Sequence, residues 1–224
     1  MKNYDASKFD RPSVTVDILV FTIDRDELKI VLIKRGVAPF KDTWALPGGF
    51  VKMDESLEEA AARELHEETG IKKEMYLEQL YTFGRPDRDP RTRVITAAYM
   101  ALTPEATLTL DAATDAADAR LFSIKKLPPL AFDHKEILRV GIDRLKSKIR
   151  YTNIAYGLLP TYFRLSQLQD VYEIILGKKM DKRNFRKQML ASGLLETTQK
   201  EDRSGAHRPA LLYRFKKKEI TFVD

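Results

Sequence analysis

The pattern of hydrophobic and polar positions at the start of the chain predicts a β-hairpin. Residues 13–23 are rich in β-branched and aromatic side chains, and residues 24–27 (DRDE) are typical of a turn. Residues 28–35 alternate between hydrophobic and polar side chains, as expected of a strand with one buried face. Further strands are expected at residues 75–83, 94–102 and 119–124.

A helix is predicted from about Ser56 to Thr69, before the strand expected at residues 75–83. Ser56 and Glu59 have the spacing of a capping box, in which each side chain accepts a hydrogen bond from the backbone amide of the other residue. Gly70 is a typical C-terminal stop. A second amphipathic helix is expected over residues 134–148.

The periodic pattern lapses near residues 151–160, and the remaining chain has a pattern of its own. Helices are expected at residues 166–176 and 182–192, and the strands of a β-hairpin at residues 194–198 and 210–215. Two helices followed by a hairpin are typical of a winged helix-turn-helix. We therefore expect two domains, residues 1–155 and residues 156–224.

Charge is distributed unevenly between these two parts. Residues 161–224 contain 14 Lys and Arg against 8 Asp and Glu, whereas residues 1–160 contain 25 of each kind. The whole net charge of +6 therefore belongs to the C-terminal part, which favours a polyanion as its partner.

The absence of cysteine excludes disulfides and thiolate chemistry, and no apolar run suggests a membrane span or a secretory signal. We expect a cytoplasmic protein.

The helix over residues 56–69 carries carboxylates on the side that should be buried. At about 100° per residue, Glu64 and Glu68 fall within the arc of the apolar residues, and Glu67 lies at its margin. Carboxylates beside a core are costly unless they are paired or bound to a metal. Three carboxylates at positions i, i+3 and i+4 face one point, as hard oxygen ligands for Mg²⁺ or Mn²⁺ would.

Two interpretations of this helix remain open from its residues alone. One is a metal site, to which Gly48 in the tight turn upstream could add its carbonyl oxygen. The other is a surface helix with charge pairs, in which Arg63 neutralises one carboxylate.

The wider spacing favours the metal site. Residues 49–71, GFVKMDESLEEAAARELHEETGI, resemble the Nudix box: a glycine, five residues, a glutamate, seven residues, and then R-E-apolar-x-E-E-x-G-apolar. All nine specified positions match. The resemblance implies an α/β fold, an α/β/α sandwich around a mixed sheet. It also implies Mg²⁺-dependent hydrolysis of a nucleoside diphosphate linked to another moiety.

The resemblance also assigns individual residues. The implied catalytic set is Glu55, Arg63, Glu64, Glu67 and Glu68. Within it the last three glutamates would hold the metal together with the Gly48 carbonyl, and Arg63 would orient a carboxylate. The metal would neutralise the pyrophosphate and lower the pKa of an attacking water. His66 and His134 receive no catalytic role, because one lies on the outward arc and the other opens a helix.

The charged loop GRPDRDPRTR, residues 84–93, places cations beside the expected pyrophosphate site. Taken alone, it is typical of a solvated polar loop. Beside a pyrophosphate its arginines would form bidentate phosphate contacts, and the short string RDPR resembles ADP-ribose-type Nudix proteins. The arginines are Arg85, Arg88, Arg91 and Arg93. Asp87 and Asp89 in the same loop are candidates for a general base on position alone.

The second helix of the C-terminal part has a basic outward face. Phe185, Met189 and Leu190 are expected to pack inward. The opposite arc carries guanidinium and amide groups, which read guanine and adenine edges in the major groove. Its residues are Arg183, Asn184, Lys187 and Gln188. Lys182 and Arg186 lie at the margin of this arc and suit phosphates. The wing turn offers Arg203, His207 and Arg208 as further DNA-binding candidates. An ordinary solvated basic helix is the alternative, and the neighbouring helix, hairpin and localised charge favour DNA.

A Nudix domain followed by a winged helix resembles the Nudix-related transcriptional regulators of NAD metabolism and sugar utilisation (NrtR- and AraR-like). The strings LSQLQDVYEIILGKKMDKRNFRKQML, RPALLYRF and LAFDH carry this resemblance. It implies a homodimer on a double-stranded DNA operator, with an ADP-ribose-like nucleotide or a sugar as effector. Many such regulators have an eroded Nudix box, whereas the box is complete here. An ADP-ribose-type pyrophosphohydrolase without a regulatory role is therefore the alternative, beside a sugar-responsive regulator.

Overall fold

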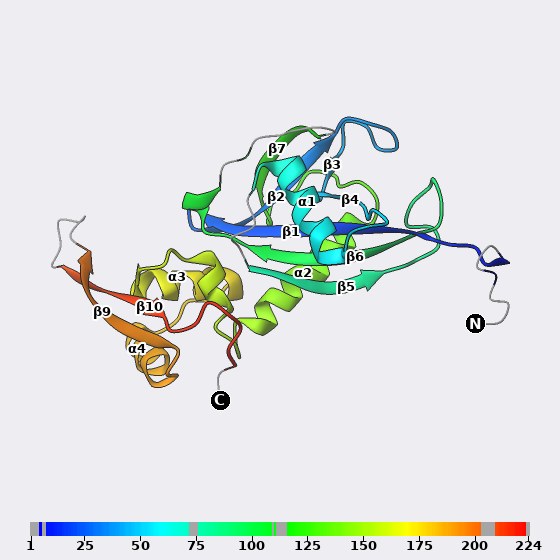
Figure 1. Cartoon of the computed structure of the whole chain (residues 1–224). Helices are drawn as coiled ribbons and strands as arrows, with labels where there is room; N and C mark the ends of the chain where they lie inside the picture. The colour runs from blue at the N-terminus through cyan, green and yellow to red at the C-terminus, as the bar shows by residue number, and fades with distance from the viewer. Residues whose placement is uncertain are drawn as a thin grey trace.

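The protein consists of a larger α/β unit and a smaller unit with its own three-stranded sheet (Figure 1). The structure is a computed structural model that describes residues 5, 8–71, 76–108, 110, 116–202 and 209–222. Among these residues no helix is both long and apolar enough to cross a membrane. The order of elements agrees with the prediction of an α/β domain followed by a winged helix.

The larger unit is built on a mixed seven-stranded sheet. Its strands run in the order β3-β2-β1-β6-β5, with β4 paired to β1 and β7 paired to β2. They are β1 (Ser13–Asp24), β2 (Glu27–Arg35), β3 (Trp44–Ala45), β4 (Gly48–Phe50), β5 (Tyr76–Phe83), β6 (Val94–Leu102) and β7 (Ala116–Ser123). β1 and β6 are parallel, and the other pairs are antiparallel. β1 is the middle strand of this order and therefore lies at the centre of the sheet.

Strand β2 corrects one expectation. Its alternating sequence predicts one buried face, but residues 30–33 are all buried. The sheet is covered on both sides: Ile30 and Leu32 join the core that includes α2 (His134–Lys148), and Val31 joins the core that includes α1 (Leu57–Thr69). The prediction of a half-buried strand is wrong because the two helices cover opposite faces.

Helix α1 begins and ends where its sequence predicts. The Ser56 hydroxyl accepts a hydrogen bond from the Glu59 amide at 3.2 Å, and the Ser56 amide donates to the Glu59 carboxylate at 2.8 Å. Gly70 has a φ of 74°, a left-handed conformation that glycine adopts without steric cost. The helix packs on the sheet through Ala60, Ala61 and Leu65. Glu68 is buried on the same side, as the helical count predicts.

The smaller unit is a helix-turn-helix with a hairpin. It comprises β8 (Phe163–Arg164), α3 (Leu165–Leu176), α4 (Lys182–Ala191), β9 (Leu195–Asp202) and β10 (Ala210–Phe215). β10 is the middle strand of its sheet. β9 runs four residues further than predicted, to Asp202, so part of the expected turn is strand. Residues 203–208, which include the wing candidates Arg203, His207 and Arg208, lie outside the described residues.

Helix α4 packs through a narrower face than predicted. Phe185 is buried against Tyr172, with ring centroids 5.3 Å apart, and Met189 is partly buried against the same core. Leu190 is 43% exposed, so its predicted burial is wrong. It follows Phe185 by five residues and therefore points about 140° away from it around the helix.

One continuous apolar core joins the two units. It extends from Leu19 in β1, through the short helix η3 (Ile154–Leu158), to Phe185 in α4. The smaller unit therefore packs directly against the larger one. The predicted boundary between residues 155 and 156 falls within η3 and stays a prediction.

The side chain of Asn153, between α2 and η3, fastens the segment that follows β10. Its amide group donates hydrogen bonds to the carbonyls of Lys217 at 3.3 Å and Glu219 at 2.9 Å. Its carbonyl oxygen accepts from the Thr221 amide at 2.8 Å. Asn153 is itself buried, so these bonds are shielded from water. The winged helix is thus attached at both its beginning and its end.

A carboxylate fixes the turn between α3 and α4. Glu173 accepts hydrogen bonds from the Gln169 amide at 2.8 Å and the Met180 backbone N–H at 3.0 Å. It also pairs with the Lys179 ammonium at 2.6 Å. These hydrogen bonds, that from Lys179 first, lower the pKa of Glu173 to about 2.

We expect Glu173 to contribute to the acid sensitivity of the fold. Because its folded pKa of about 2 lies below the ordinary value of 4.5, the carboxylate stabilises the native state above pH 4.5. This contribution is lost as the pH falls through the folded pKa. Glu173→Gln should lower the midpoint of thermal unfolding at neutral pH and flatten its decline in acid, whereas Glu105→Gln, at an exposed position, should do neither. Identical acid profiles for Glu173→Gln and the unmodified protein would contradict this account.

Candidate functional site

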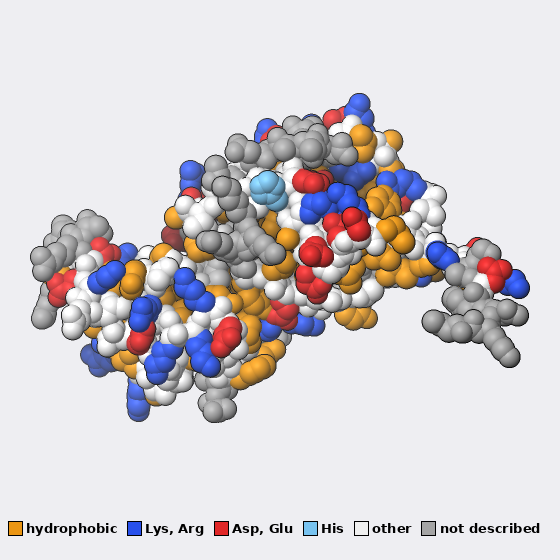
Figure 2. Space-filling model, viewed as in Figure 1, with side chains coloured by type: hydrophobic (Ala, Val, Ile, Leu, Met, Phe, Trp, Pro, Cys, Tyr) orange, Lys and Arg blue, Asp and Glu red, His pale blue; other side chains and the backbone are white. Residues whose placement is uncertain are grey.

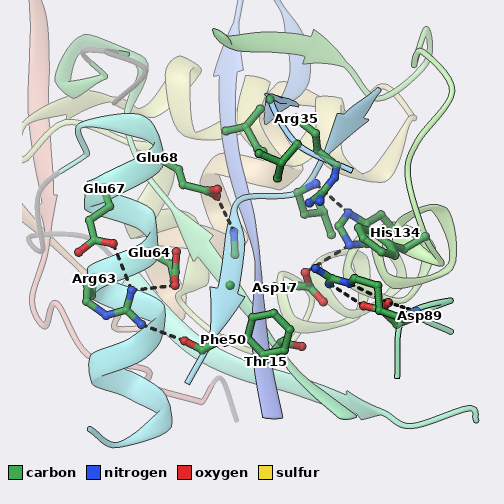
Figure 3. A pocket seen from close by; sticks show the side chains of 18 of the residues that line it. Thr15, Asp17, Arg35, Phe50, Arg63, Glu64, Glu67, Glu68, Asp89 and His134 are labelled. Carbon is green, nitrogen blue, oxygen red and sulfur yellow. Dashed lines mark hydrogen bonds and ion pairs between the residues drawn. The ribbon is translucent and has the colours of Figure 1, made fainter. Parts of the chain in front are cut away.

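A cavity of about 570 Å³ lies in the larger unit and joins segments that are far apart in the sequence. Its walls come from β1, β2, β4, α1, the loop at residues 84–93 and the start of α2. In the close view, Arg63, Glu64 and Glu67 from α1 lie on one side, and Arg35 and His134 lie on the other (Figure 3). The cavity therefore has an acidic wall and a wall with basic side chains.

The acidic wall is held close to the backbone of the glycine turn. The Gly48 amide donates a hydrogen bond to the Glu68 carboxylate at 2.8 Å. A Cβ atom at Gly49 would lie 2.3 Å from Oε1 of Glu64, so a larger residue here would displace this carboxylate. Burial raises the pKa of Glu68 to about 8 and is also the largest cause of a raised pKa at Glu64. Within the described part of the chain, Glu68 has no ion-pair partner.

Arg63 connects the carboxylates of the Nudix box. Its guanidinium donates to Glu55 at 2.8 Å, to Glu64 at 2.7 Å and to Glu67 at 3.1 Å. It also donates to the Phe50 carbonyl at 3.1 Å, which ties α1 to β4. The structure thus brings all five predicted catalytic residues, Glu55, Arg63, Glu64, Glu67 and Glu68, into one connected or adjacent group.

The acidic wall suits a divalent cation by the chemistry of its donors. No three Asp, Glu or His side chains of the described residues already stand at mutual distances that would hold a metal. Glu64, Glu67 and Glu68 nevertheless line the same cavity, and all are hard oxygen donors. Two of them share the Arg63 guanidinium, and the third has no cationic partner in the described structure. These residues fit Mg²⁺ or Mn²⁺, and a ligand role for the Gly48 carbonyl stays a prediction.

The other wall is anchored by Asp17, a buried carboxylate in the middle of β1. It pairs with Arg88 at 3.2 Å and lies 3.3 Å from Nε2 of His134. Arg88 is also bidentate to Asp133, at 2.9 and 2.8 Å. Burial raises the pKa of Asp17, but the hydrogen bond from His134 and the charge of Arg88 outweigh it, so the pKa is lowered overall.

The hydrogen bonds of His134 define its proton position. Its Nδ1 accepts a hydrogen bond from the Leu46 amide at 2.9 Å. Nδ1 therefore carries no proton, and the proton of the neutral ring lies on Nε2, facing Asp17. His134 opens α2, as predicted, and this position places its imidazole in the cavity wall.

Sequence reasoning missed both Asp17 and His134 as members of the site. A signal for Asp17 existed, because a single carboxylate within the apolar strand VTVDILVF requires a partner. No local sequence signal identifies His134, because its partners, Asp17 in β1 and Leu46, are distant from it in the sequence.

The predicted arginines of the loop lie in different environments. Arg88 is buried and committed to Asp17 and Asp133, so it builds the wall. Arg91 lines the cavity and pairs with Asp89 at 2.7 Å. Arg93 donates to two backbone carbonyls, and neither it nor Arg85 is among the residues that line the cavity.

The two candidate bases also differ in position. Asp89 is buried beside the cavity; burial raises its pKa, but its hydrogen bonds with Arg91 lower it overall. Asp87 is exposed and pairs with Arg85 at 3.3 Å. Arg35, at the end of β2, lines the cavity without having been predicted.

The exposed face of α4 has the composition expected of a DNA-reading helix. The Asp181 side chain caps the helix by accepting a hydrogen bond from the Asn184 amide at 2.9 Å. The predicted DNA-binding residues of this helix are all exposed: Lys182, Arg183, Asn184, Arg186, Lys187 and Gln188. Arg186 also reaches the Tyr213 hydroxyl at 3.4 Å. In the space-filling view, lysine and arginine side chains are spread over the smaller unit (Figure 2).

Two known domain families match successive parts of the chain. The NUDIX domain family matches residues 12–140, and the NrtR DNA-binding winged helix domain matches residues 155–215. An ADPR responsive transcriptional repressor of Acinetobacter baylyi is 39% identical over 226 residues, which cover 99% of this chain and 89% of that protein. An ADP-ribose pyrophosphatase of Methanocaldococcus jannaschii is 41% identical over 144 residues, covering 62% of this chain and 80% of that protein.

A solved structure shows the same arrangement of both units. The structure of Shewanella oneidensis NrtR complexed with a 27mer DNA has a TM-score of 0.81 and 34% sequence identity, covering 91% of this chain and 93% of that chain. Likeness of this extent includes the larger unit, the winged helix and their relative placement. The chain therefore belongs to the NrtR family, in which a Nudix domain is joined to a DNA-binding winged helix.

Proposed function

We propose that this protein is a transcriptional regulator that binds operator DNA through α4 and changes its DNA affinity when ADP-ribose occupies the cavity. The observation that carries the proposal is the continuous core, which packs the cavity-bearing unit directly against the winged helix, while the basic face of α4 stays exposed. The relative from Acinetobacter baylyi is named as an ADPR responsive repressor, which supports ADP-ribose as the effector.

The exposed side chains of α4 account for DNA binding. Arg183, Asn184, Lys187 and Gln188 supply guanidinium, ammonium and amide groups for base edges in the major groove. Lys182 and Arg186 at the margin of this face suit phosphates. We also propose a homodimer, because two recognition helices related by a two-fold axis read a pseudopalindromic operator. Binding to operator DNA supports the expected cytoplasmic location.

The charges of the cavity favour a nucleotide diphosphate over a sugar as effector. Arg35 and Arg91 line the cavity, and guanidinium groups recognise phosphate by bidentate hydrogen bonds. A neutral sugar would offer these guanidinium groups no anionic ligand. The sugar-responsive alternative therefore has less support from the residues that line the site.

Hydrolysis of the effector is a second candidate activity, favoured by the complete acidic wall. A cation held by Glu64, Glu67 and Glu68 would supply charge neutralisation for the pyrophosphate and a water of lowered pKa. Arg63 and Glu55 orient these carboxylates through the hydrogen bonds described above. Asp89 lies beside the same cavity, but its pairing with Arg91 argues against a free general base.

Replacing two base-reading side chains tests the DNA interface. Arg183→Ala combined with Lys187→Ala should weaken binding to a DNA fragment selected by the unmodified protein by about 100-fold, because each good base contact contributes about 1–3 kcal/mol. ADP-ribose binding should not change. The measurement is fluorescence anisotropy at fixed salt, with exposed Lys135→Ala plus Arg139→Ala on α2 as the matched control. Equal DNA affinity of both double variants would refute the assignment.

A titration with ADP-ribose tests the regulatory link. Addition of ADP-ribose to the complex of unmodified protein and selected DNA should change the DNA dissociation constant by about 5–150-fold, the usual range of coupling between two sites. Anisotropy at increasing ADP-ribose concentration measures this change. A pentose that shifts the DNA affinity while ADP-ribose does not would favour the sugar-responsive alternative.

Glu68→Gln tests the hydrolytic activity. The substitution removes one negative oxygen donor and should lower Mg²⁺-dependent release of AMP from ADP-ribose by at least about 100-fold, the upper range for loss of a residue that supports a metal site. Glu58→Gln, exposed on the same helix, is the control. If the unmodified protein releases no product from a panel of nucleoside diphosphates with Mg²⁺ or Mn²⁺, the cavity serves binding alone.

A further inference from the structure

We infer that Arg35 and Arg91, both packed on the ring of Phe132, form a diphosphate clamp that binds the effector without a metal ion. The inference rests on the proposed effector function, and it names the residues and the ligand group on which recognition depends. Arg35 and Phe132 belong to neither the Nudix box nor the charged loop.

Arg35 has a fixed position and an unused hydrogen-bonding edge. It is the last residue of β2, and its Nε donates to the Pro39 carbonyl at 2.9 Å. Its guanidinium carbon lies 4.9 Å from the centroid of the Phe132 ring, within the range of a cation–π contact. Within the described part of the chain, its two Nη groups have no hydrogen-bond partner and it has no ion pair. A guanidinium held in this way is pre-organised for an anion.

Arg91 approaches the same ring from the charged loop. Its guanidinium carbon lies 5.8 Å from the centroid of Phe132 and 5.3 Å from that of Phe50. Its Nε and one Nη donate to Asp89 at 3.0 and 2.7 Å, which fixes the plane of the group. Its other Nη makes no hydrogen bond with any described residue and can donate to a ligand.

Holding two guanidinium groups over one ring is electrostatically unfavourable until an anion arrives. Burial first, and then repulsion by Arg91, lower the pKa of Arg35, although nearby carboxylates including Glu68 act in the opposite direction. An anion with two neighbouring charges would relieve this repulsion by pairing with both groups. A diphosphate carries one charge on each phosphate and so matches the pair.

The backbone at Phe132 indicates that the position of its ring matters. Phe132 has a φ of 52°, in the strained left-handed region that a bulky aromatic residue rarely adopts. Its ring is also supported by Phe40, with centroids 4.8 Å apart. Strained backbone of this kind is retained at ligand sites, and here it carries the support for both arginines.

Arg35 lies across the cavity from most of the acidic wall. Figure 3 shows Arg35 across from Arg63, Glu64 and Glu67. A diphosphate held by the arginines is therefore bound by positive side chains of the protein, whereas the carboxylates need a cation before they attract it. Recognition by the clamp and hydrolysis at the acidic wall then depend on different residues and differ in their metal requirement.

Calorimetric titration of the full-length protein with ADP-ribose, in Mg²⁺ and in EDTA, tests the clamp. We expect the unmodified protein to bind in EDTA with a dissociation constant within about threefold of that in Mg²⁺. Arg35→Ala should weaken binding by at least about tenfold in both buffers, since it removes charge-assisted hydrogen bonds to the diphosphate. Arg35→Lys keeps the charge but loses the bidentate guanidinium. Its dissociation constant should lie between those of the unmodified protein and Arg35→Ala.

Lys34→Ala is the matched control, because Lys34 is the neighbouring cation on β2 and is not among the residues that line the cavity. It should bind ADP-ribose as the unmodified protein does. Inorganic pyrophosphate should compete with ADP-ribose for the unmodified protein and not for Arg35→Ala. The thermal midpoint of each variant without ligand shows whether it is folded.

The outcomes separate the clamp from the proposed function. If the unmodified protein binds ADP-ribose and folded Arg35→Ala binds it equally well, the clamp is refuted and the effector function stands. Loss of binding by the unmodified protein in EDTA would also refute the clamp, because the metal would then hold the diphosphate. If the unmodified protein binds no ADP-ribose in either buffer, the effector function itself fails.

Discussion

A single buried carboxylate, Asp17, determines how the walls of the cavity are placed. A charge in the middle of a central strand is tolerated only when its partners are fixed beside it, since removing one partner would leave an uncompensated charge in the core. Its two partners come from other segments, Arg88 from the charged loop and His134 from the start of α2. The glycine turn also packs here, because a Cβ at Gly48 would lie 3.0 Å from the Asp17 Cα. Loop, helix and turn therefore share one anchor.

A chain of packed elements connects this anchor to the winged helix. α2 begins at the cavity and leads, through Asn153 and η3, into the core that includes α3 and α4. A displacement at the start of α2 would therefore be transmitted through packed side chains to α3 and α4. Closely packed protein interiors shift between discrete arrangements more readily than they deform continuously. This packing gives a physical basis for communication between a small ligand and a DNA-reading helix.

The sequence predicted the parts of the site that lie within one element. The glutamates of α1 follow from helical periodicity and fixed spacing, and the capping residues Ser56 and Gly70 follow from local backbone chemistry. It did not predict the wall formed by Arg35, Phe132 and His134, because these residues meet only in three dimensions; the hydrogen bond from Leu46 to His134 spans 88 residues. The burial of β2 and of Leu190 was also predicted wrongly, because it depends on which other elements cover each face of the sheet and of α4. Arg88 was recognised as a useful cation, but its commitment to Asp17 and Asp133 required the fold.

The hydrogen bonds of Asn153 bear on which side chains of the C-terminal tail can change during evolution. Its side chain binds the carbonyls of Lys217 and Glu219 and the amide of Thr221 through backbone atoms alone, so the identity of those three side chains is not involved. A winged helix of different sequence but the same tail conformation would engage the same asparagine. These hydrogen bonds therefore constrain the backbone conformation of the tail and leave the side chains at its three bonded positions free to change.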